Sequence, residues 1–221
     1  MHQSIGASRV LCVAFGVIAA LAGEAFSTTF TNSTPIAIPG PGSSDGSEIS
    51  VSGLGNSITS VSVSVSNFSD THVGDVGLVL VGPTGTALAL QGDCGGSTSA
   101  MGISLAFADG ASMLPENLLI TSGTFQPTQY ASIGSFPSPG PGLAYNSPAP
   151  FGTSTFLTTF AGDNPNGNWS LYAMDPISGD TGEISNGWTL QITAVPEPAS
   201  LSLVALAGAS LICHRKRVLR R

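Results

Sequence analysis

The stretch SITSVSVSVSNF at residues 57–68 alternates apolar and polar side chains, with Val61, Val63 and Val65 separated by serines. This period of two places the apolar side chains on one face of a strand and leaves the other face to solvent. Residues 28–194 contain no stretch of helical periodicity, and the chain's 28 Gly and 15 Pro residues favour turns. We therefore predict an all-β fold.

Further strands follow at regular intervals. Residues 76–91 predict two strands joined by a turn at Gly82-Pro83-Thr84-Gly85, and residues 101–109 alternate in the same way. Residues 110–156 are rich in proline, which predicts a long loop rather than central strands. Trp169 and Trp188 each begin a strand of alternating pattern. We expect both rings to fill one sandwich core rather than to stack on a ligand.

Charge is divided between the centre of the chain and its ends. Residues 26–195, called the body below, hold eleven acidic residues and no Lys or Arg, which gives a formal charge near −11 against −7 for the whole chain. Such a surface repels nucleic acid and anionic lipid, so neither is an expected partner. Cys94 is the body's single cysteine, so no disulfide can form within it.

The N-terminal segment predicts export. A short, weakly basic stretch at residues 1–9 precedes an apolar run at residues 10–22, which is the pattern of a secretory signal peptide. We assign it to residues 1–25, with cleavage after Ala25; Ala22 and Ser27 are alternative sites. The domain itself is then assigned to residues 28–194.

The C-terminal segment, residues 195–221, has three parts in a fixed order. Two prolines flank an acidic residue, a 15-residue apolar run follows, and a basic cluster ends the chain. The residues at the two ends of this pattern are Pro196, Glu197, Pro198, Arg215, Lys216 and Arg217. A 15-residue helix rises only about 22 Å, short of the roughly 30 Å hydrocarbon core, and its basic end would stay cytoplasmic.

This order of parts resembles the PEP-CTERM sorting signal of Gram-negative bacteria. The resemblance implies recognition by an exosortase, transient membrane association through a sorting helix, and removal of the tail. It places the mature protein on the outer surface of the cell envelope or in the extracellular exopolysaccharide matrix. An ordinary C-terminal membrane anchor is the alternative.

Three segments of the body together resemble the P domain of subtilisin-like proprotein convertases. They share turn motifs in the same order and spacing: Thr71-His72, Gly74-Asp75, Gly82-Pro83 with Gly85, Asn166-Gly167 with Trp169, and Gly179-Asp180 with Gly182. The resemblance covers residues 35–193. It implies an eight-stranded, jelly-roll-like β-sandwich without catalytic residues of its own.

One motif suggests an enzyme. The sequence GDCGG at residues 92–96 is similar to the nucleophile loop of chymotrypsin-like proteases, with Cys94 in place of serine. His72 is the body's only candidate base, and it lies 22 residues upstream within one hairpin system, unlike the arrangement in those proteases. We therefore predict no enzymatic activity. For His72 we expect a hydrogen bond that fixes a turn, with metal ligation as the alternative.

Acidic residues gather at predicted turns and strand ends. SDTHVGD places Asp70 and Asp75 around one turn, and DPISGDTGE places Asp175, Asp180 and Glu183 around another. Without Lys or Arg, these carboxylates must be solvated, hydrogen-bonded to backbone amides, or bound to a cation. We predict that at least one Ca²⁺ binds at one of the two turns, which the P-domain resemblance also implies.

The expected function follows from the export signals and the missing catalytic motifs. We expect a non-enzymatic, surface-retained module with a structural, adhesive or matrix role, with exopolysaccharide or an exported protein as its partner. The alternative is an accessory domain that binds or stabilises an exported protease or polysaccharide enzyme in trans.

Overall fold

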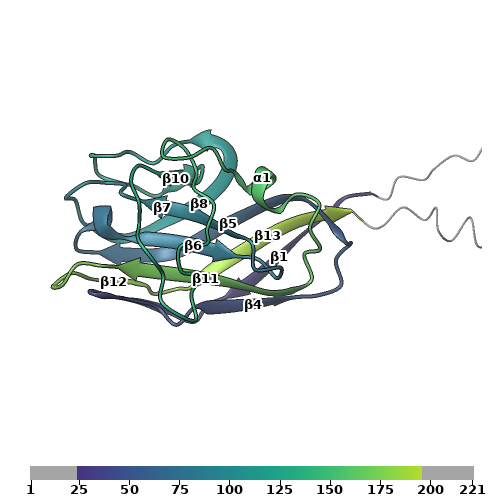
Figure 1. Cartoon of the computed structure of the whole chain (residues 1–221), viewed down its shortest axis with the longest axis horizontal. Helices are drawn as coiled ribbons and strands as arrows, with labels where there is room; N and C mark the ends of the chain where they lie inside the picture. The colour runs from purple at the N-terminus through teal and green to yellow at the C-terminus, as the bar shows by residue number, and fades with distance from the viewer. Residues whose placement is uncertain (1–23, 196–221) are drawn as a thin grey trace, which may run out of the picture. The chain divides into compact units, whose positions relative to one another are not determined.

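The computed structural model describes residues 24–195, which form thirteen strands, one short α-helix and one 3-10 turn (Figure 1). The strands are β1 (Phe26–Asn32), β2 (Ile36–Pro39), β3 (Gly42–Ser43), β4 (Ser47–Val51), β5 (Ser57–Asp70), β6 (Gly77–Val81), β7 (Ala87–Gly92), β8 (Ala100–Ser112), β9 (Gly123–Phe125), β10 (Thr128–Gln129), β11 (Gly167–Asp175), β12 (Thr181–Ile184) and β13 (Trp188–Val195). The helix α1 is Phe156–Phe160 and the 3-10 turn η1 is Val73–Asp75.

Almost all of the assigned signal peptide and all of the sorting residues lie outside the described residues. Within residues 24–195, no helix has the length and apolar character needed to cross a membrane.

The strands form two sheets. The first has the order β1-β13-β5-β12-β2, and β8 pairs with β5 and carries β9. The second has the order β10-β7-β6-β11-β3, and β4 also pairs with β11. The predicted all-β sandwich is therefore confirmed. The described part has more strands than the eight that the resemblance implies, because several edge pairings involve only two to four residues.

The main core lies between the sheets and follows the predicted alternation. In β5 the row of buried side chains includes Val61, Val63 and Val65, and in β11 and β13 the rows begin at Trp169 and Trp188. Both tryptophans belong to one cluster of buried residues, as predicted. Trp169 also donates a hydrogen bond from Nε1 to the carbonyl of Pro165 at 2.9 Å, so its polar atom is satisfied inside the core.

The proline-rich segment contains no central strand, as predicted, because β9 and β10 pair only at sheet edges. Its fold produces a second, smaller core that the sequence pattern did not indicate. Ile133 and Phe136 from this segment pack against Val79, Tyr172 and Met174 on the outer face of the second sheet. Both faces of this sheet are therefore covered.

The helix α1 was not predicted. With five residues it is too short to produce a periodic apolar pattern. Its ends are set by local hydrogen bonds instead: Thr155 and Thr158 form a capping box, and the Asp109 carboxylate accepts from the backbone amides of Phe156 and Leu157 at 3.0 and 2.8 Å.

The core can be tested at Trp169, which is fully buried and lies 5.1 Å from the Phe160 ring. Trp169→Ala should lower the free energy of unfolding by about 3–5 kcal/mol, because it removes a large buried side chain and leaves a cavity. Urea denaturation measures this loss. Phe151 is 54% exposed, and Phe151→Ala should change the same quantity by less than about 0.5 kcal/mol. Equal losses in the two variants would contradict the assigned core.

Candidate metal site

Two core strands end in an inward-facing aspartate. In β5 the buried row that includes Val63, Val65 and Phe68 reaches Asp70, which is 3% exposed. In β11 the buried row that starts at Trp169 reaches Asp175, which is 0% exposed. The alternation that builds the core therefore also carries two carboxylates into the interior.

Both aspartates stand where the chain crosses between the sheets. Residues 70–77 lead from β5 in the first sheet to β6 in the second, and residues 175–181 lead from β11 back to β12 in the first. The two crossings are hydrogen-bonded to each other, since the Thr71 amide donates to the Thr181 carbonyl at 3.3 Å and the Thr181 amide to Thr71 Oγ1 at 3.2 Å. In Figure 1, β12 lies at the end of the sandwich away from the point where the described chain begins and ends.

Each buried carboxylate uses one oxygen in its own turn. Asp70 Oδ1 accepts from the His72 amide at 2.7 Å, and Asp175 Oδ1 accepts from the Ile177 amide at 2.8 Å. The second oxygen of each, Oδ2, is buried and has no hydrogen-bond partner among the described residues. The turn-forming and cation-binding interpretations of these aspartates are thus compatible, because they use different oxygens of the same carboxylate.

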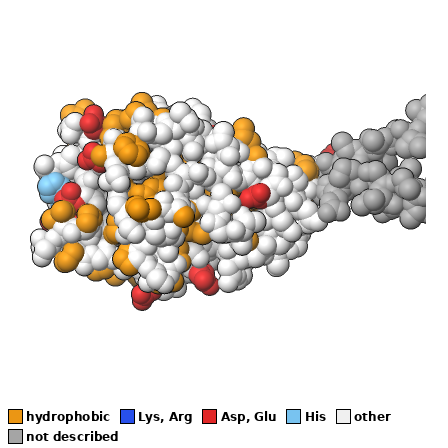
Figure 2. Space-filling model, in the orientation of Figure 1, with side chains coloured by type: hydrophobic (Ala, Val, Ile, Leu, Met, Phe, Trp, Pro, Cys, Tyr) orange, Lys and Arg blue, Asp and Glu red, His pale blue; other side chains and the backbone are white. Residues whose placement is uncertain are grey.

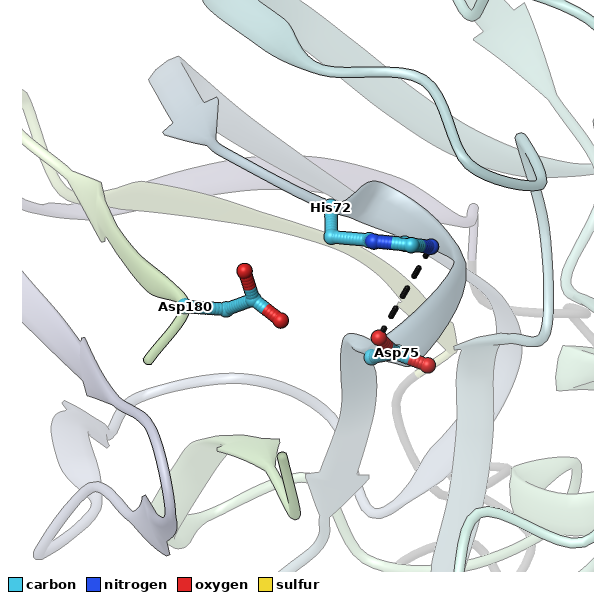
Figure 3. A group of neighbouring side chains, drawn as sticks. All are labelled: His72, Asp75 and Asp180. Atoms are coloured by element: carbon cyan, nitrogen blue, oxygen red, sulfur yellow. Dashed lines mark ion pairs between the residues drawn. The ribbon is translucent and has the colours of Figure 1, made fainter. Parts of the chain in front are cut away.

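Three partly exposed side chains lie at the outer side of this site. One ligand atom from each of His72, Asp75 and Asp180 lies within 4.8 Å of the other two. Figure 3 shows that the three side chains face a common space, with Asp180 approaching from the opposite crossing. Thr71 Oγ1 donates to Asp180 Oδ1 at 3.1 Å, which orients that carboxylate. On the face of the described part that Figure 2 shows, acidic side chains are scattered singly and none has the colour of Lys or Arg.

Burial and mutual repulsion raise the pKa of both inner carboxyl groups. Desolvation is the largest cause of the rise for Asp70, to a pKa of about 6, and the charges of Asp175, Asp180 and Asp75 add to it. The pKa of Asp175 is raised for the same reasons, with Asp180 and Asp75 as the repelling charges. For each residue the turn hydrogen bond opposes the rise without cancelling it. The four aspartates are therefore electrostatically coupled, and a cation among them would relieve the repulsion.

Four of the five predicted ligands, from both turns, are thus close enough for their charges to act on one another, whereas Glu183 faces elsewhere. In β12, Gly182 lies opposite Asp70, and a side chain on Gly182 would collide with Asp70 Oδ2. The next residue, Glu183, faces the opposite side of the sheet, where it is exposed and accepts a hydrogen bond from Ser185 Oγ. Glu183 therefore does not point into the site.

Cys94 occupies a different environment from a catalytic thiol. It is fully buried, and its Sγ donates to the carbonyls of Gly92 and Thr128 at 3.4 and 3.5 Å. Burial, with a smaller contribution from the charges of Asp93 and Glu116, raises the pKa of the Cys94 thiol to about 12. A thiol in these surroundings stays protonated at neutral pH and is not a nucleophile.

Comparisons with known proteins assign no family. No protein-family model matches the chain, and no curated protein matches it. Among solved structures, the complex of the Aeromonas sobria serine protease with its chaperone aligns with 78% of this chain at 13% identity and a TM-score of 0.37. The same serine protease alone aligns with 77% at 15% identity and a TM-score of 0.36. The alignment spans 26% of the length of each of those chains. The P-domain resemblance therefore stays a prediction, and a β-rich domain is what is shown.

Sequence reasoning identified the aspartates but not their union into one site. The sequence offers the two turns as alternatives, and for His72 it predicts a turn hydrogen bond with metal ligation as the alternative. A signal was present for Asp175, which continues the alternation that starts at Trp169. For Asp70 the alternation of Val61, Val63 and Val65 predicts the outer face, and a register shift between Val65 and Phe68 turns Asp70 inward. No comparable signal places Asp180 beside His72, because 108 residues separate them in the chain.

Asp70 gives this site a measurable pH dependence when metal is removed. Its pKa is about 6 in the fold against 3.8 for an ordinary aspartate, so the folded protein binds the proton more tightly than the unfolded chain. Stability contributed by this group is therefore present at low pH and is lost as pH rises from about 4 through about 6. We expect the urea midpoint in a calcium-free buffer with chelator to fall over this range.

Asp70→Asn is the matched variant, because it keeps the shape of the side chain and removes the titration. The fall between pH about 4 and about 6 should become shallower in this variant. An unchanged slope would show that Asp70 does not titrate in this window.

Proposed function

We propose that this chain is an exported, surface-retained, non-enzymatic β-sandwich module with a structural, adhesive or matrix role, and that Ca²⁺ fastens its two sheets together at the crossings. The observation that carries the calcium part is the pair of buried, unpartnered Oδ2 atoms of Asp70 and Asp175. The export and retention part rests on the terminal segments of the sequence.

The chemistry of the donors fits a hard divalent cation. Ca²⁺ takes six to eight oxygen ligands from carboxylates, carbonyls and water. Asp70 and Asp175 supply one free oxygen each, and the charges of Asp75 and Asp180 act on both of these carboxyl groups. Leaving two carboxylate oxygens buried without partners is costly, so a bound cation offers a physical reason for the arrangement.

Such an ion would link elements that are distant in the chain. Asp70 ends β5 in the first sheet, and Asp175 ends β11 in the second. A cation held by both joins the sheets at the end of the sandwich away from the chain ends (Figure 1). Because the ion binds the folded state and not the separated strands, it stabilises the fold by linkage.

The non-enzymatic part of the proposal is supported by the state of the one candidate nucleophile. The Cys94 thiol is buried and protonated, and its Sγ donates to two backbone carbonyls. A module with a structural or adhesive role acts through its folded surface outside the cell. Its resistance to unfolding is therefore the property that the proposed ion would improve.

Calcium should raise the thermal stability of the protein. A calcium concentration about 100 times the Kd adds about 2.7 kcal/mol. At about 2–4 °C per kcal/mol for a domain of this size, the melting temperature should rise by roughly 5–10 °C over that in chelator. Thermal unfolding followed by circular dichroism measures the shift.

Two variants locate the ion. Asp70→Asn should remove most of the calcium-induced shift, and in chelator it should be as stable as the parent or more so, because it removes a buried, repelled charge. Glu183→Gln makes the same change of charge on the neighbouring strand and should keep the full shift. If calcium leaves the parent's melting temperature unchanged, the aspartates act in their turns alone.

Surface retention and the type of partner can be tested in cells. When a tagged chain is expressed in a Gram-negative bacterium that has an exosortase, it should lose its C-terminal segment. The mature form should then be recovered from the outer surface or matrix. Cell fractionation with mass spectrometry of the C-terminus measures both. A mature chain that still carries Arg221 in the inner membrane would contradict sorting.

Affinity capture by the mature protein separates the two functional hypotheses. Recovery of exopolysaccharide supports the structural or adhesive role. Recovery of one exported protease or polysaccharide enzyme in stoichiometric amount would favour the accessory-domain alternative instead.

A further inference from the structure

The gap between His72 and Asp75 is too wide for a hydrogen bond. His72 Nε2 lies 3.8 Å from Asp75 Oδ2, whereas N–H···O bonds span about 2.7–3.2 Å. Two bonds of about 2.0–2.2 Å from one Zn²⁺ ion to an imidazole nitrogen and a carboxylate oxygen span roughly 3.4 Å at a tetrahedral angle. The observed separation is thus closer to that of two ligands of one ion.

Asp180 supplies a third donor to the same space. Because the three ligand atoms of His72, Asp75 and Asp180 lie within 4.8 Å of one another, some point lies no more than about 2.8 Å from all of them. A contraction of less than about 1 Å then gives bonding distances. The side chains of His72 and Asp75 are 37% and 31% exposed, so they have room to adjust and solvent can reach the space they enclose (Figure 3).

The charge of the whole site favours a second cation. Ionised Asp70, Asp75, Asp175 and Asp180 carry four negative charges, and one Ca²⁺ balances two of them. Residues 24–195 contain no Lys or Arg that could balance the rest. Asp175 Oδ2, which is fully buried and unpartnered, lies close enough to His72, Asp75 and Asp180 for their charges to affect its pKa. A second divalent ion would neutralise the site.

We propose that His72, Asp75 and Asp180 form an outer metal site that binds a first-row divalent ion of the Zn²⁺ type, next to the inner calcium position at Asp70 and Asp175. The imidazole nitrogen selects this class of ion, since Ca²⁺ prefers oxygen ligands. Asp75 and Asp180 repel the carboxyl groups of Asp70 and Asp175, so an ion at the outer site would also reduce the repulsion at the inner position. The inner half of this proposal rests on the proposed function, while the outer half does not require calcium.

The test is a calorimetric titration of the purified full chain with Zn²⁺ in the presence of saturating Ca²⁺. All proteins carry His2→Ser, Cys12→Ser, Cys213→Ser and His214→Ser, because these residues outside the body could bind Zn²⁺ themselves. We expect one equivalent of Zn²⁺ to bind without release of Ca²⁺. His72→Gln should weaken Zn²⁺ binding by more than roughly 100-fold, since even partners outside the coordination shell are worth about 10- to 100-fold.

The calcium-induced shift in melting temperature provides the separate readout. His72→Gln should keep that shift, because His72 is not an inner ligand, and so the variant also reports that the protein is folded. Three results would overturn the outer site: no Zn²⁺ binding in calcium, unchanged Zn²⁺ affinity in His72→Gln, or displacement of Ca²⁺ by Zn²⁺ one for one. If instead the parent shows no calcium shift but still binds Zn²⁺ through His72, the inner calcium position fails and the outer site stands.

Discussion

Burial of one face of β5 and one face of β11 is the constraint on which the rest of the structure depends. These strands lie in different sheets and present their inward rows to the same core. Side chains alternate along each strand, with one irregularity in β5 between Val65 and Phe68, so the residue at the last inward position is carried into the interior. In both strands that residue is an aspartate, so the packing of the core and the composition of the site have one cause.

The site also illustrates how a domain without basic residues can balance buried charge. In most proteins a buried carboxylate is paired with Arg or Lys or hydrogen-bonded at both oxygens. Here the Asx turns at Asp70 and Asp175 satisfy one oxygen of each, and in residues 24–195 no basic side chain except His72 is available for the other. The proposed cation would take that role, and its binding would convert a repulsive cluster into a link between the sheets.

This arrangement makes the stability of the module depend on its surroundings. In the absence of metal, burial and repulsion raise the pKa of Asp70 and Asp175, so ionisation of these groups opposes folding at neutral pH. If the proposed metal binds, the same ionised groups would serve as ligands and would favour folding. A module that acts outside the cell would then be most stable where divalent ions are abundant, which agrees with the proposed surface role.

Local sequence patterns are enough to predict the fold class, the strands that build the core and the candidate aspartates. These properties follow from local patterns: alternation in residues 57–68, the two tryptophans that begin apolar rows, and glycine or proline at turns. The helix at residues 156–160 could not be predicted, because five residues are too few to show a helical period. The second core could not be predicted either, because a proline-rich loop has no apolar periodicity that indicates which sheet face it covers.

Tertiary structure alone decided which aspartates meet. Asp70 and Asp175 belong to different sheets, so the effect of one charge on the other depends on how the two sheets pack. His72 and Asp180 belong to different crossings, and the same packing brings their ligand atoms within 4.8 Å. The same packing directs Glu183 away from Asp70. Because Gly182 pairs with Asp70, the next side chain of β12 lies on the opposite face of the sheet. A sequence records which residues can hold a cation, but only contacts between distant segments place their oxygens around one point.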